Sequence, residues 1–489
     1  MHSIAKLLSK ILPLGGWGGF FLLLLLVSCN DDDTFTTSRL NYLFIPVDTV
    51  KMDTIFANIP VASKKLWIYN YSGDGIRCSS VRLQKGNQSG FRVNVDGLWL
   101  GEQTGYQTND IEVRKGDSIR VFVELTSPDN GSALYKEIDD NLIFRLESGV
   151  EQILNLNACA WNADIVRNLE VKKDSTIDTT ISGKALVVYG GITVDSLATL
   201  TIAPGSTIFF HDDAEINVKG KLLCQGTAEK NITLRGDRLD DILKDIPYDI
   251  LSGRWQGIHF ASSSYNNILE YTDLHGGKNA IVCDSSDVTR NKLTINSSTI
   301  HNFKGYGLAL FNSKVNVSNT QISNAGDDCV AVCGGDLSLI HNTIAQFYPF
   351  AECGAALRFG NTDGISAYPL TKFEVKNCIV TGYYNDVVML NKKDSVALNY
   401  HFYDSMLRTP EVKDSAYTKY FDGIIWEEVE DTATTGKKNF VKIDTDQFLY
   451  DFHLDPASKA KGTANAKWML PLNRNGLPRD EKKLDMGCY

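Results

Sequence analysis

A short pattern that recurs in the second half of the chain limits its fold more than any other feature. Written N-x-[TI]-[IAV]-x-[NG], it matches five segments whose starts lie 26, 22, 23 and 35 residues apart: 271–276, 297–302, 319–324, 342–347 and 377–382. A recurring period of this length is typical of solenoids, in which each repeat is buried only by its neighbours. One coil of about 22 residues accommodates three short strands and three bends. Longer intervals indicate loops inserted at bends.

Stacked coils bring equivalent residues of successive repeats together. The pattern therefore predicts a ladder of asparagines at its first position, including Asn319, Asn342 and Asn377, whose amides hydrogen-bond from coil to coil. It also predicts a second ladder of small side chains beside the first, formed by Thr272, Ser298, Thr320, Thr343 and Cys378.

Two segments carry a resemblance to a known fold. Residues 199–210 (TLTIAPGSTIFF) and 215–227 (EINVKGKLLCQGT) resemble the first coils of bacterial right-handed parallel β-helices of the pectate-lyase-like kind. The resemblance implies such a β-helix over residues 164–440. Residues 452–462 and 484–489 resemble the tails of bacterial β-helix proteins, which implies a C-terminal capping extension over residues 441–489.

The preceding part of the chain has a different pattern. Polar and apolar residues alternate in four short runs separated by Gly- and Asp-rich turns: 64–70, 91–95, 118–125 and 141–146. Such runs are typical of antiparallel sandwiches. Residues 39–163 resemble the immunoglobulin-like (Ig-like) modules of bacterial surface proteins. The predicted fold class is therefore all-β, with an N-terminal Ig-like β-sandwich followed by a right-handed parallel β-helix solenoid.

The N-terminus has the features of an export signal. Lys6 and Lys10 precede an apolar run over residues 20–27, which is too short to span a bilayer, since spanning takes about 20 residues. The run ends in Leu-Val-Ser-Cys, which resembles the lipobox of bacterial lipoproteins. The resemblance implies that residues 1–28 are a signal peptide and that Cys29 is acylated. An ordinary secretory signal is the alternative.

An acidic segment follows the predicted lipid site. Asp31, Asp32 and Asp33 resemble the surface-export signal of Bacteroidetes lipoproteins, which implies a protein on the outer face of the outer membrane. The alternative is that residues 29–38 are only a solvated acidic tether. The formal net charge of −10 also argues against a nucleic-acid partner.

Cysteine spacing gives little evidence of chemistry. Nine cysteines remain besides Cys29, without a C-x-x-C pair, so zinc ribbons and thioredoxin-like motifs are not indicated. Most of them lie in apolar runs and are expected to be small buried hydrophobes.

Two fragments resemble the catalytic segments of polygalacturonases, which are β-helix glycoside hydrolases. Residues 324–332 (NAGDDCVAV) resemble the Asp-Asp segment and residues 361–364 (NTDG) the Asn-Thr-Asp segment. The resemblance implies Asp327, Asp328 and Asp363 as acid and base of an inverting hydrolysis. The order of the segments is reversed here, however, and the Gly-His-Gly and Arg-x-Lys segments of that family are missing. The alternative is that these aspartates bond local backbone at bends.

Other potential sites are weaker. Asp284, Asp287 and Arg290 share one bend, as in a calcium-dependent lyase, but their spacing is also that of a solvated loop. The histidines lie on different coils, so the sequence predicts no metal site and no cofactor: His211, His259, His275, His301 and His341. The insertion 237–253 is expected to form a short helix packed on the coils, or else a lid or docking element.

These features predict a surface-exposed outer-membrane lipoprotein that acts as a binding or scaffolding module of the cell envelope and is not itself catalytic. Its expected partners are the membrane, through the acyl anchor, and either a polysaccharide or an outer-membrane protein complex. The alternative is a polysaccharide-degrading glycoside hydrolase or lyase that uses the aspartates at 327, 328 and 363.

Overall fold

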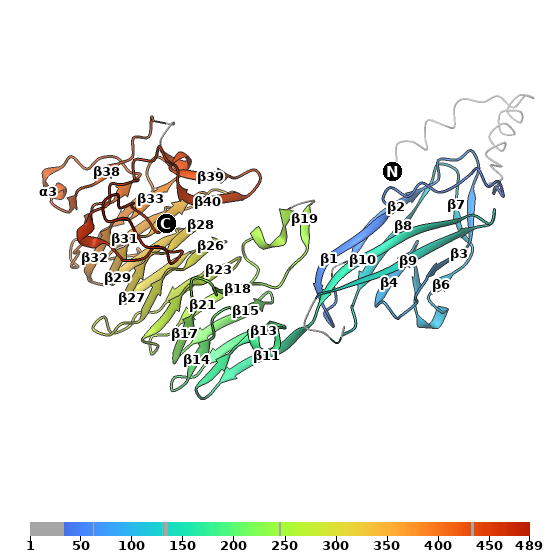
Figure 1. Cartoon of the computed structure of the whole chain (residues 1–489), viewed down its shortest axis with the longest axis horizontal. Helices are drawn as coiled ribbons and strands as arrows, with labels where there is room; N and C mark the ends of the chain where they lie inside the picture. The colour runs from blue at the N-terminus through green and yellow to red at the C-terminus, as the bar shows by residue number, and fades with distance from the viewer. Residues whose placement is uncertain (1–33, 62, 130, 132–134, 244–245, 432–434) are drawn as a thin grey trace, which may run out of the picture. The chain divides into compact units, whose positions relative to one another are not determined.

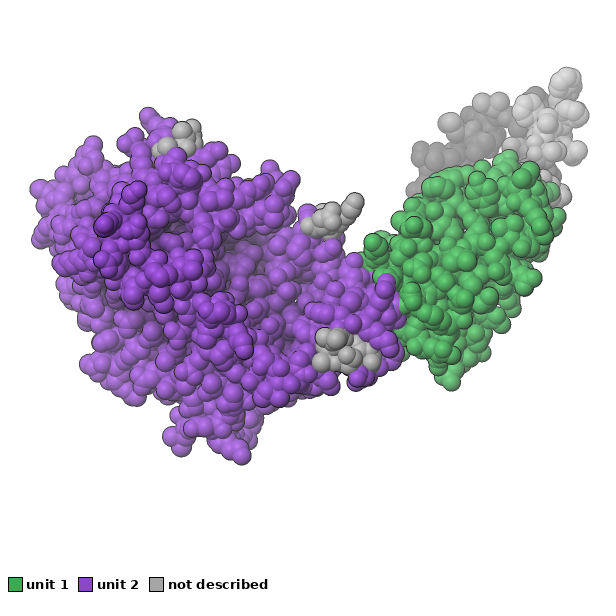
Figure 2. All heavy atoms as spheres, viewed as in Figure 1, with its two compact units in different colours: residues 1–51, 60–126, 139–157 green, residues 52–59, 127–138, 158–489 purple. Residues whose placement is uncertain are grey.

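A computed structural model describes residues 34–489, except 62, 130, 132–134, 244–245 and 432–434. The predicted signal peptide, Cys29 and the acidic residues Asp31, Asp32 and Asp33 lie outside the described residues. The chain divides into two compact units, residues 1–51, 60–126 and 139–157 and residues 52–59, 127–138 and 158–489 (Figure 2). No helix among the described residues has the length and apolar character needed to cross a membrane.

Two β-sheets lie largely within the first unit, although residues 52–56, 136–138 and 158–161 of their strands are assigned to the second. One has the order β2-β8-β4-β5 with antiparallel pairing: β2 (Lys64–Tyr69), β8 (Ser118–Leu125), β4 (Phe91–Val95) and β5 (Leu98–Leu100). The other has the order β1-β10-β9-β3-β6, with β7 also paired to β3: β1 (Thr49–Phe56), β10 (Glu151–Trp161), β9 (Lys136–Leu146), β3 (Ile76–Leu83), β6 (Gln107–Thr108) and β7 (Ile111–Val113). A 3-10 turn, η1 (Glu102–Thr104), precedes β6.

Alternation of apolar and polar residues along the sequence explains why these segments form strands with one buried side. In β8, Ile119, Val121 and Val123 are buried while Arg120 is exposed, so one side of the strand faces the core. All four segments expected from the alternation are strands, as β2, β4, β8 and β9.

The second unit is a parallel sheet of 26 strands wound into coils (Figure 1). Each strand pairs in parallel with the equivalent strand of the next coil, typically three strands later, as β14 does with β17 and β22 with β25. Every coil therefore contributes to three faces, here called A, B and C. This all-β, parallel, solenoid-like arrangement is what the repeat predicts.

Face A contains β12 (Ser175–Ile177), β14 (Thr199–Ile202), β17 (Lys221–Gln225), β22 (Asn267–Glu270), β25 (Leu293–Asn296), the second halves of β27 (Leu308–Ser318) and β29 (Val330–Ile340), β32 (Leu370–Lys376), β35 (His401–Tyr403) and β37 (Phe421–Asp422). Face B contains the first halves of β11 (Ala163–Val171) and β13 (Ala185–Val194), then β15 (Thr207–Phe210), β18 (Ile232–Gly236), β23 (Thr272–His275), β26 (Thr299–Phe303), β28 (Gln321–Ala325), β30 (Thr343–Gln346), β33 (Ile379–Gly382), β36 (Met406–Leu407) and β38 (Ile425–Trp426). Face C contains the second halves of β11 and β13, β16 (Glu215–Val218), β21 (Gly257–Phe260), β24 (Ile281–Cys283), the first halves of β27 and β29, β31 (Leu357–Gly360) and β34 (Val388–Asn391).

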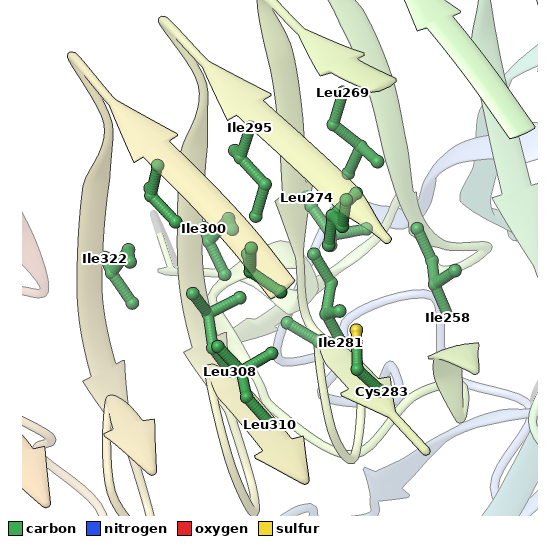
Figure 3. Close-up of a cluster of buried hydrophobic side chains, with 14 of the residues drawn as sticks. Ile258, Leu269, Leu274, Ile281, Cys283, Ile295, Ile300, Leu308, Leu310 and Ile322 are labelled. Atoms are coloured by element: carbon green, nitrogen blue, oxygen red, sulfur yellow. The ribbon is translucent and has the colours of Figure 1, made fainter. Parts of the chain in front are cut away.

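Like side chains stack inside the coils. On face C, Ile258 lies beside Ile281 and Ile281 beside Leu308; on face B, Ile300 lies beside Ile322 (Figure 3). These side chains are at most 2% exposed. Full burial of such a side chain contributes about 1.5–3 kcal/mol. The inward positions are therefore the main source of stability.

The bend before face B requires a left-handed backbone in successive coils. The residues there have φ between 43° and 53°: Tyr271, Ser297, Asn319, His341, Asn377 and Asp404. The predicted asparagine ladder is wrong at Asn342, because Gln321 pairs with Thr343 and so His341 occupies this corner instead. Asparagine favours this conformation because its short polar side chain bonds local backbone.

The ladder of small side chains exists with one change of membership. The backbone N–H of Thr272 donates to Ser298 Oγ at 3.1 Å, and that of Thr320 donates to Asn342 Oδ1 at 2.9 Å. Asn342, rather than Thr343, therefore belongs to this ladder. Each bond satisfies a backbone N–H at the bend by the side chain of the next coil.

The C-terminal segment packs along face B. A hairpin of β39 (Phe440–Asp444) and β40 (Leu449–Leu454) is followed by a tail over residues 455–489 (Figure 1). Its apolar residues, among them Phe452 and Met486, cover the outer side of β30, β33 and β36. Every residue of β28, β30 and β33 is consequently buried, whereas face A strands alternate.

The tail is also bonded to the left-handed corners. Asn377 Nδ2 donates to the carbonyl of Asn465 at 2.9 Å, and Asn377 Oδ1 accepts from the Asn465 N–H at 2.8 Å. Arg479 Nη2 donates to Asn319 Oδ1 at 2.8 Å. The corner side chains thus point outward and hold the tail across several coils.

The insertion 237–253 differs from the helix expected there. It forms an antiparallel pair, β19 (Asp241–Leu243) with β20 (Ile246–Pro247), followed by one 3-10 turn, η2 (Tyr248–Ile250). The remaining short helices lie at α2 (Thr179–Ser182), α3 (Ser415–Thr418), η3 (Gly436–Asn439) and η4 (Ala466–Trp468). The nine cysteines beyond Cys29 are free; seven are buried, and Cys159 and Cys353 are partly buried.

Replacing Thr320 by valine tests the ladder. The change keeps the shape of the side chain but removes the hydroxyl that donates to the Ser318 carbonyl at 2.7 Å and accepts from the Ser298 N–H. We expect the free energy of unfolding of the solenoid-like unit to fall by about 1–3 kcal/mol, the cost of buried polar groups left unpaired. Urea unfolding followed by circular dichroism measures it. The matched control is Thr176→Val on the exposed side of β12, and an equal loss in both variants would contradict the role of the ladder.

Candidate functional site

A pocket of about 430 Å³ lies on face C, over β27, β29, β31 and β34. Its lining includes Tyr306, Phe311, Asp328, Arg358, Thr362, Asp363, Ile365 and Asn391. Asp328 and Asp363, two of the three candidate catalytic residues of the hydrolase alternative, thus reach one pocket. Asp327 is not part of its lining.

Asp328 is engaged as a structural anion. Its carboxylate accepts from Arg358 Nε at 2.7 Å, from Arg358 Nη2 at 3.1 Å and from the Ala355 N–H at 2.7 Å, and the residue is only 4% exposed. This hydrogen bonding to Asp328 raises the pKa of Arg358 further. Both carboxylate oxygens are thus occupied by hydrogen bonds within the protein.

The other two aspartates have different surroundings. Asp363 is exposed, and its Oδ1 accepts from the N–H groups of Ile365 and Ser366 at 2.8 and 2.6 Å, as expected of a bend residue. Burial, and next the charge of Asp328, raise the pKa of Asp327. A raised pKa is the direction that a general acid needs.

A second pocket, of about 520 Å³, lies on face B between the strands, η2, the hairpin and the tail. Its polar lining comes from successive coils and the tail: Asp249, Asp273, Thr299, His301, Asn302, Gln321, Ser323, Asn324, Arg474 and Asn475. Its rings come from the hairpin and the tail: Phe448, Tyr450, Phe452, His453 and Tyr489. The Tyr489 hydroxyl donates to Gln321 Oε1 at 2.6 Å, which links the two walls.

A cluster of histidines and carboxylates forms one end of the face B pocket. His275 on β23 pairs in register with His301 on β26, and their rings stack with centroids 4.7 Å apart. His275 Nδ1 lies 2.6 Å from Asp273 Oδ1, and His275 Nε2 lies 2.8 Å from Asp249 Oδ1. His301 Nε2 lies 3.3 Å from the same Asp273 oxygen.

The charges within the cluster support one another. Burial opposes protonation of His275, but Asp273 and Asp249 outweigh it and raise the pKa of His275 to about 9. Burial alone would raise the pKa of Asp273, yet His275 and His301 hold it well below its usual range. The donor atoms of Asp273, His275 and His301 lie within 4.8 Å of one another. Among the described residues, this group has the spacing of metal ligands.

His275 and His301 lie on different coils, as expected, but these coils are neighbours and strand pairing brings the two rings together. A signal was present in the sequence: both occupy the fifth position of the repeat, in YTDLHG and SSTIHN. The bend residues Asp284, Asp287 and Arg290, by contrast, do not converge. Asp284 bonds His259 at 3.0 Å, Asp287 caps the Thr289 N–H, and Arg290 lies over the ring of Tyr265.

Comparisons with known proteins add little. No protein-family model matches the chain, and no curated protein matches it. Among solved structures, a family 123 glycoside hydrolase from Clostridium perfringens, reported for glycolipid glycan hydrolysis, has 8% identity and a TM-score of 0.17. The match covers 24% of this chain and 24% of that one, so the chain spans about a quarter of its length. A likeness this small carries no argument about fold or function.

Acid is expected to loosen the tail that forms one wall of the face B pocket. His341 is fully buried; its Nδ1–H donates to the Gly487 carbonyl at 3.2 Å and its Nε2 accepts from Asn377 Nδ2 at 3.0 Å. Burial, and next the charge of Arg479, lower the pKa of His341 to about 3. In the unfolded chain a histidine takes up its proton near pH 6.5, whereas folded His341 stays neutral down to about pH 3. The free energy of unfolding therefore falls between about pH 6.5 and pH 3, by about 1.4 kcal/mol for each pH unit.

The variant His341→Asn tests this origin, because asparagine suits the left-handed corner and does not titrate. Unfolding midpoints between pH 7 and pH 4 should depend less on pH in this variant than in the native chain. His211→Asn, at a partly exposed histidine after β15, is the control and should keep the native dependence. A native acid dependence in His341→Asn would assign the effect to other groups.

Proposed function

We propose that the protein is a lipid-anchored binding module of the outer membrane, facing the cell exterior, which binds carbohydrate in the face B pocket and does not catalyse its cleavage. In this proposal the coils are a right-handed parallel β-helix and the first unit is an Ig-like domain that precedes it.

The composition of the face B pocket carries the proposal. Amides and carboxylates from successive coils face rings from the hairpin and the tail. Sugars present hydroxyl groups for the first kind of side chain and apolar C–H faces for the second. The volume of about 520 Å³ is within the range of small-ligand sites. Gln321 and Asn324, both buried, supply rigid polar groups at the base.

The hydrogen bonds of the carboxylates in the face B pocket agree better with binding than with catalysis. Asp273 and Asp249 are both bonded to His275, and Asp249 is also 2.9 Å from Arg235. Neither carboxyl is placed as a protonated donor. An inverting glycosidase needs one carboxyl as acid and another as base.

One observation favours the hydrolase alternative. Burial, and next the neighbouring charge of Asp328, raise the pKa of Asp327, which lies close to a pocket of suitable size. A carboxyl with a raised pKa is what the general acid of a glycosidase needs. Against it, Asp328 is held by Arg358, and Asp363 bonds backbone.

Calorimetric titration with neutral, amino and acidic oligosaccharides tests carbohydrate binding. Asn475→Ala and His453→Ala each remove a polar group of the face B pocket and should weaken binding about tenfold, the effect of one lost hydrogen bond. Asp363→Asn, which keeps the bend on face C, is the matched control and should bind normally. Absence of binding across the panel contradicts the proposal. Release of reducing ends that stops in Asp327→Asn would support the hydrolase instead.

The anchor has a separate test. Cys29→Ser should abolish labelling by a fatty-acid analogue and release the chain from the membrane fraction, whereas Cys353→Ser should do neither. Replacement of Asp31, Asp32 and Asp33 by alanine should leave the protein membrane-bound but protected from protease added to intact cells. A membrane-bound Cys29→Ser protein would disprove lipidation at this residue. Recovery of a stoichiometric outer-membrane protein with the native chain would favour the scaffolding role expected from the sequence.

A further inference from the structure

We propose that Asp273, His275 and His301 form a binding site for a divalent first-row metal ion, of which zinc is the type, with one coordination position open to the face B pocket. The inference does not depend on carbohydrate binding, since it concerns only the arrangement of these side chains.

The donor atoms converge on one point. Asp273 Oδ1 lies 2.6 Å from His275 Nδ1 and 3.3 Å from His301 Nε2. Zinc binds imidazole nitrogen and carboxylate oxygen at about 2.0–2.2 Å, so tetrahedral ligand atoms lie about 3.3 Å apart. The Asp273–His301 separation already has this value. The Asp273–His275 separation of 2.6 Å needs to lengthen by about 0.7 Å when a metal displaces the shared proton.

The backbone fixes this convergence. β23 and β26 are neighbouring parallel strands with His275 opposite His301, and Asp273 lies two residues before His275 on the same side of β23. The histidine side chains therefore need no rearrangement of the coils to share one ion. Their positions are set by strand pairing rather than by a loop, which is the more precise way to build a site.

A second carboxylate orients His275. Asp249 Oδ1 accepts from His275 Nε2 at 2.8 Å and is itself held by Arg235 Nη2 at 2.9 Å. An imidazole whose far nitrogen donates to a carboxylate directs its other nitrogen to the metal, an arrangement found around most histidine ligands. Asp249 lies in η2, so the insertion 237–253 provides this support.

The site also has an open side. Asp273 and His301 line the face B pocket, whereas His275 is 6% exposed and lies behind them. Three protein ligands plus a free position are typical of metal sites that bind water or a substrate group. A dication, the carboxylates of Asp273 and Asp249 and the guanidinium of Arg235 together carry one net positive charge. This charge favours an anionic or hydroxyl oxygen as the fourth ligand.

Other histidine–carboxylate pairs in the described part of the chain provide a contrast. His211, His259, His401 and His453 each bond one aspartate, but none has a second histidine in the same pair. Each of these pairs therefore offers two ligand atoms to a metal ion, one fewer than Asp273, His275 and His301 together. His259 with Asp284, at 3.0 Å on face C, is thus a suitable internal control.

The experiment is titration of Zn²⁺ into the full chain, purified in detergent without a histidine tag and stripped by a chelator. We expect one Zn²⁺ per chain by calorimetry, and a Co²⁺ derivative with the visible absorption of a low-coordinate nitrogen and oxygen site. His301→Gln should weaken Zn²⁺ binding by at least about 100-fold, and Asp249→Asn by about 10–100-fold. His259→Gln should bind as the native chain does.

Thermal unfolding separates loss of the site from loss of the fold. Zn²⁺ should raise the unfolding temperature of the native chain and of His259→Gln, because it binds the folded state alone, but not that of a folded His301→Gln. Failure of the folded native chain to bind stoichiometric Zn²⁺ overturns the proposal. Equal loss of binding in His259→Gln and His301→Gln overturns it as well, since it would show unspecific surface binding.

Discussion

Parallel pairing of each strand with the equivalent strand of the next coil is the interaction on which the rest of this structure depends. Pairing in register places equivalent positions of successive coils side by side. A position that faces inward, or lies at a bend, in one coil therefore does so in the next. Inward positions become stacks such as Ile258, Ile281 and Leu308. Bend positions become ladders of hydrogen bonds. The same rule brings His275 to His301, although 26 residues separate them in the sequence.

The tail modifies one of the three faces. Outward residues of a solenoid are normally solvated, but β28, β30 and β33 are buried on both sides because the hairpin and tail cover them. Where this cover is incomplete, the face B pocket remains, with polar side chains from the coils below and rings from the hairpin and tail beside them. The location of the pocket thus follows from where the cover ends.

The repeat and the alternation of residues predicted the coarse fold, because both report directly on which side chains are buried. The asparagine ladder failed at Asn342, where the pattern was aligned one residue late; the left-handed corner accepts histidine as well as asparagine, so residue type alone did not set the register. Asp328 and Asp363 line one pocket without Asp327, and the Arg358 contact that holds Asp328 is a side-chain detail that spacing does not reveal. The face B pocket needed residues near 249, 301 and 474 together, and no local pattern connects them.

The bonds between the tail and the corner side chains also have a mechanical meaning. In a simple stack of coils, force applied at one end peels the coils off one by one, because each coil is held only by its neighbours. Here the tail is joined to Asn377, His341, Asn319 and, through Arg474, to Thr299, which belong to different coils. The tail therefore links these coils to one another directly, in addition to the strand pairing between neighbouring coils. Under tension the linked coils would give way together, and the coils that precede them would extend first.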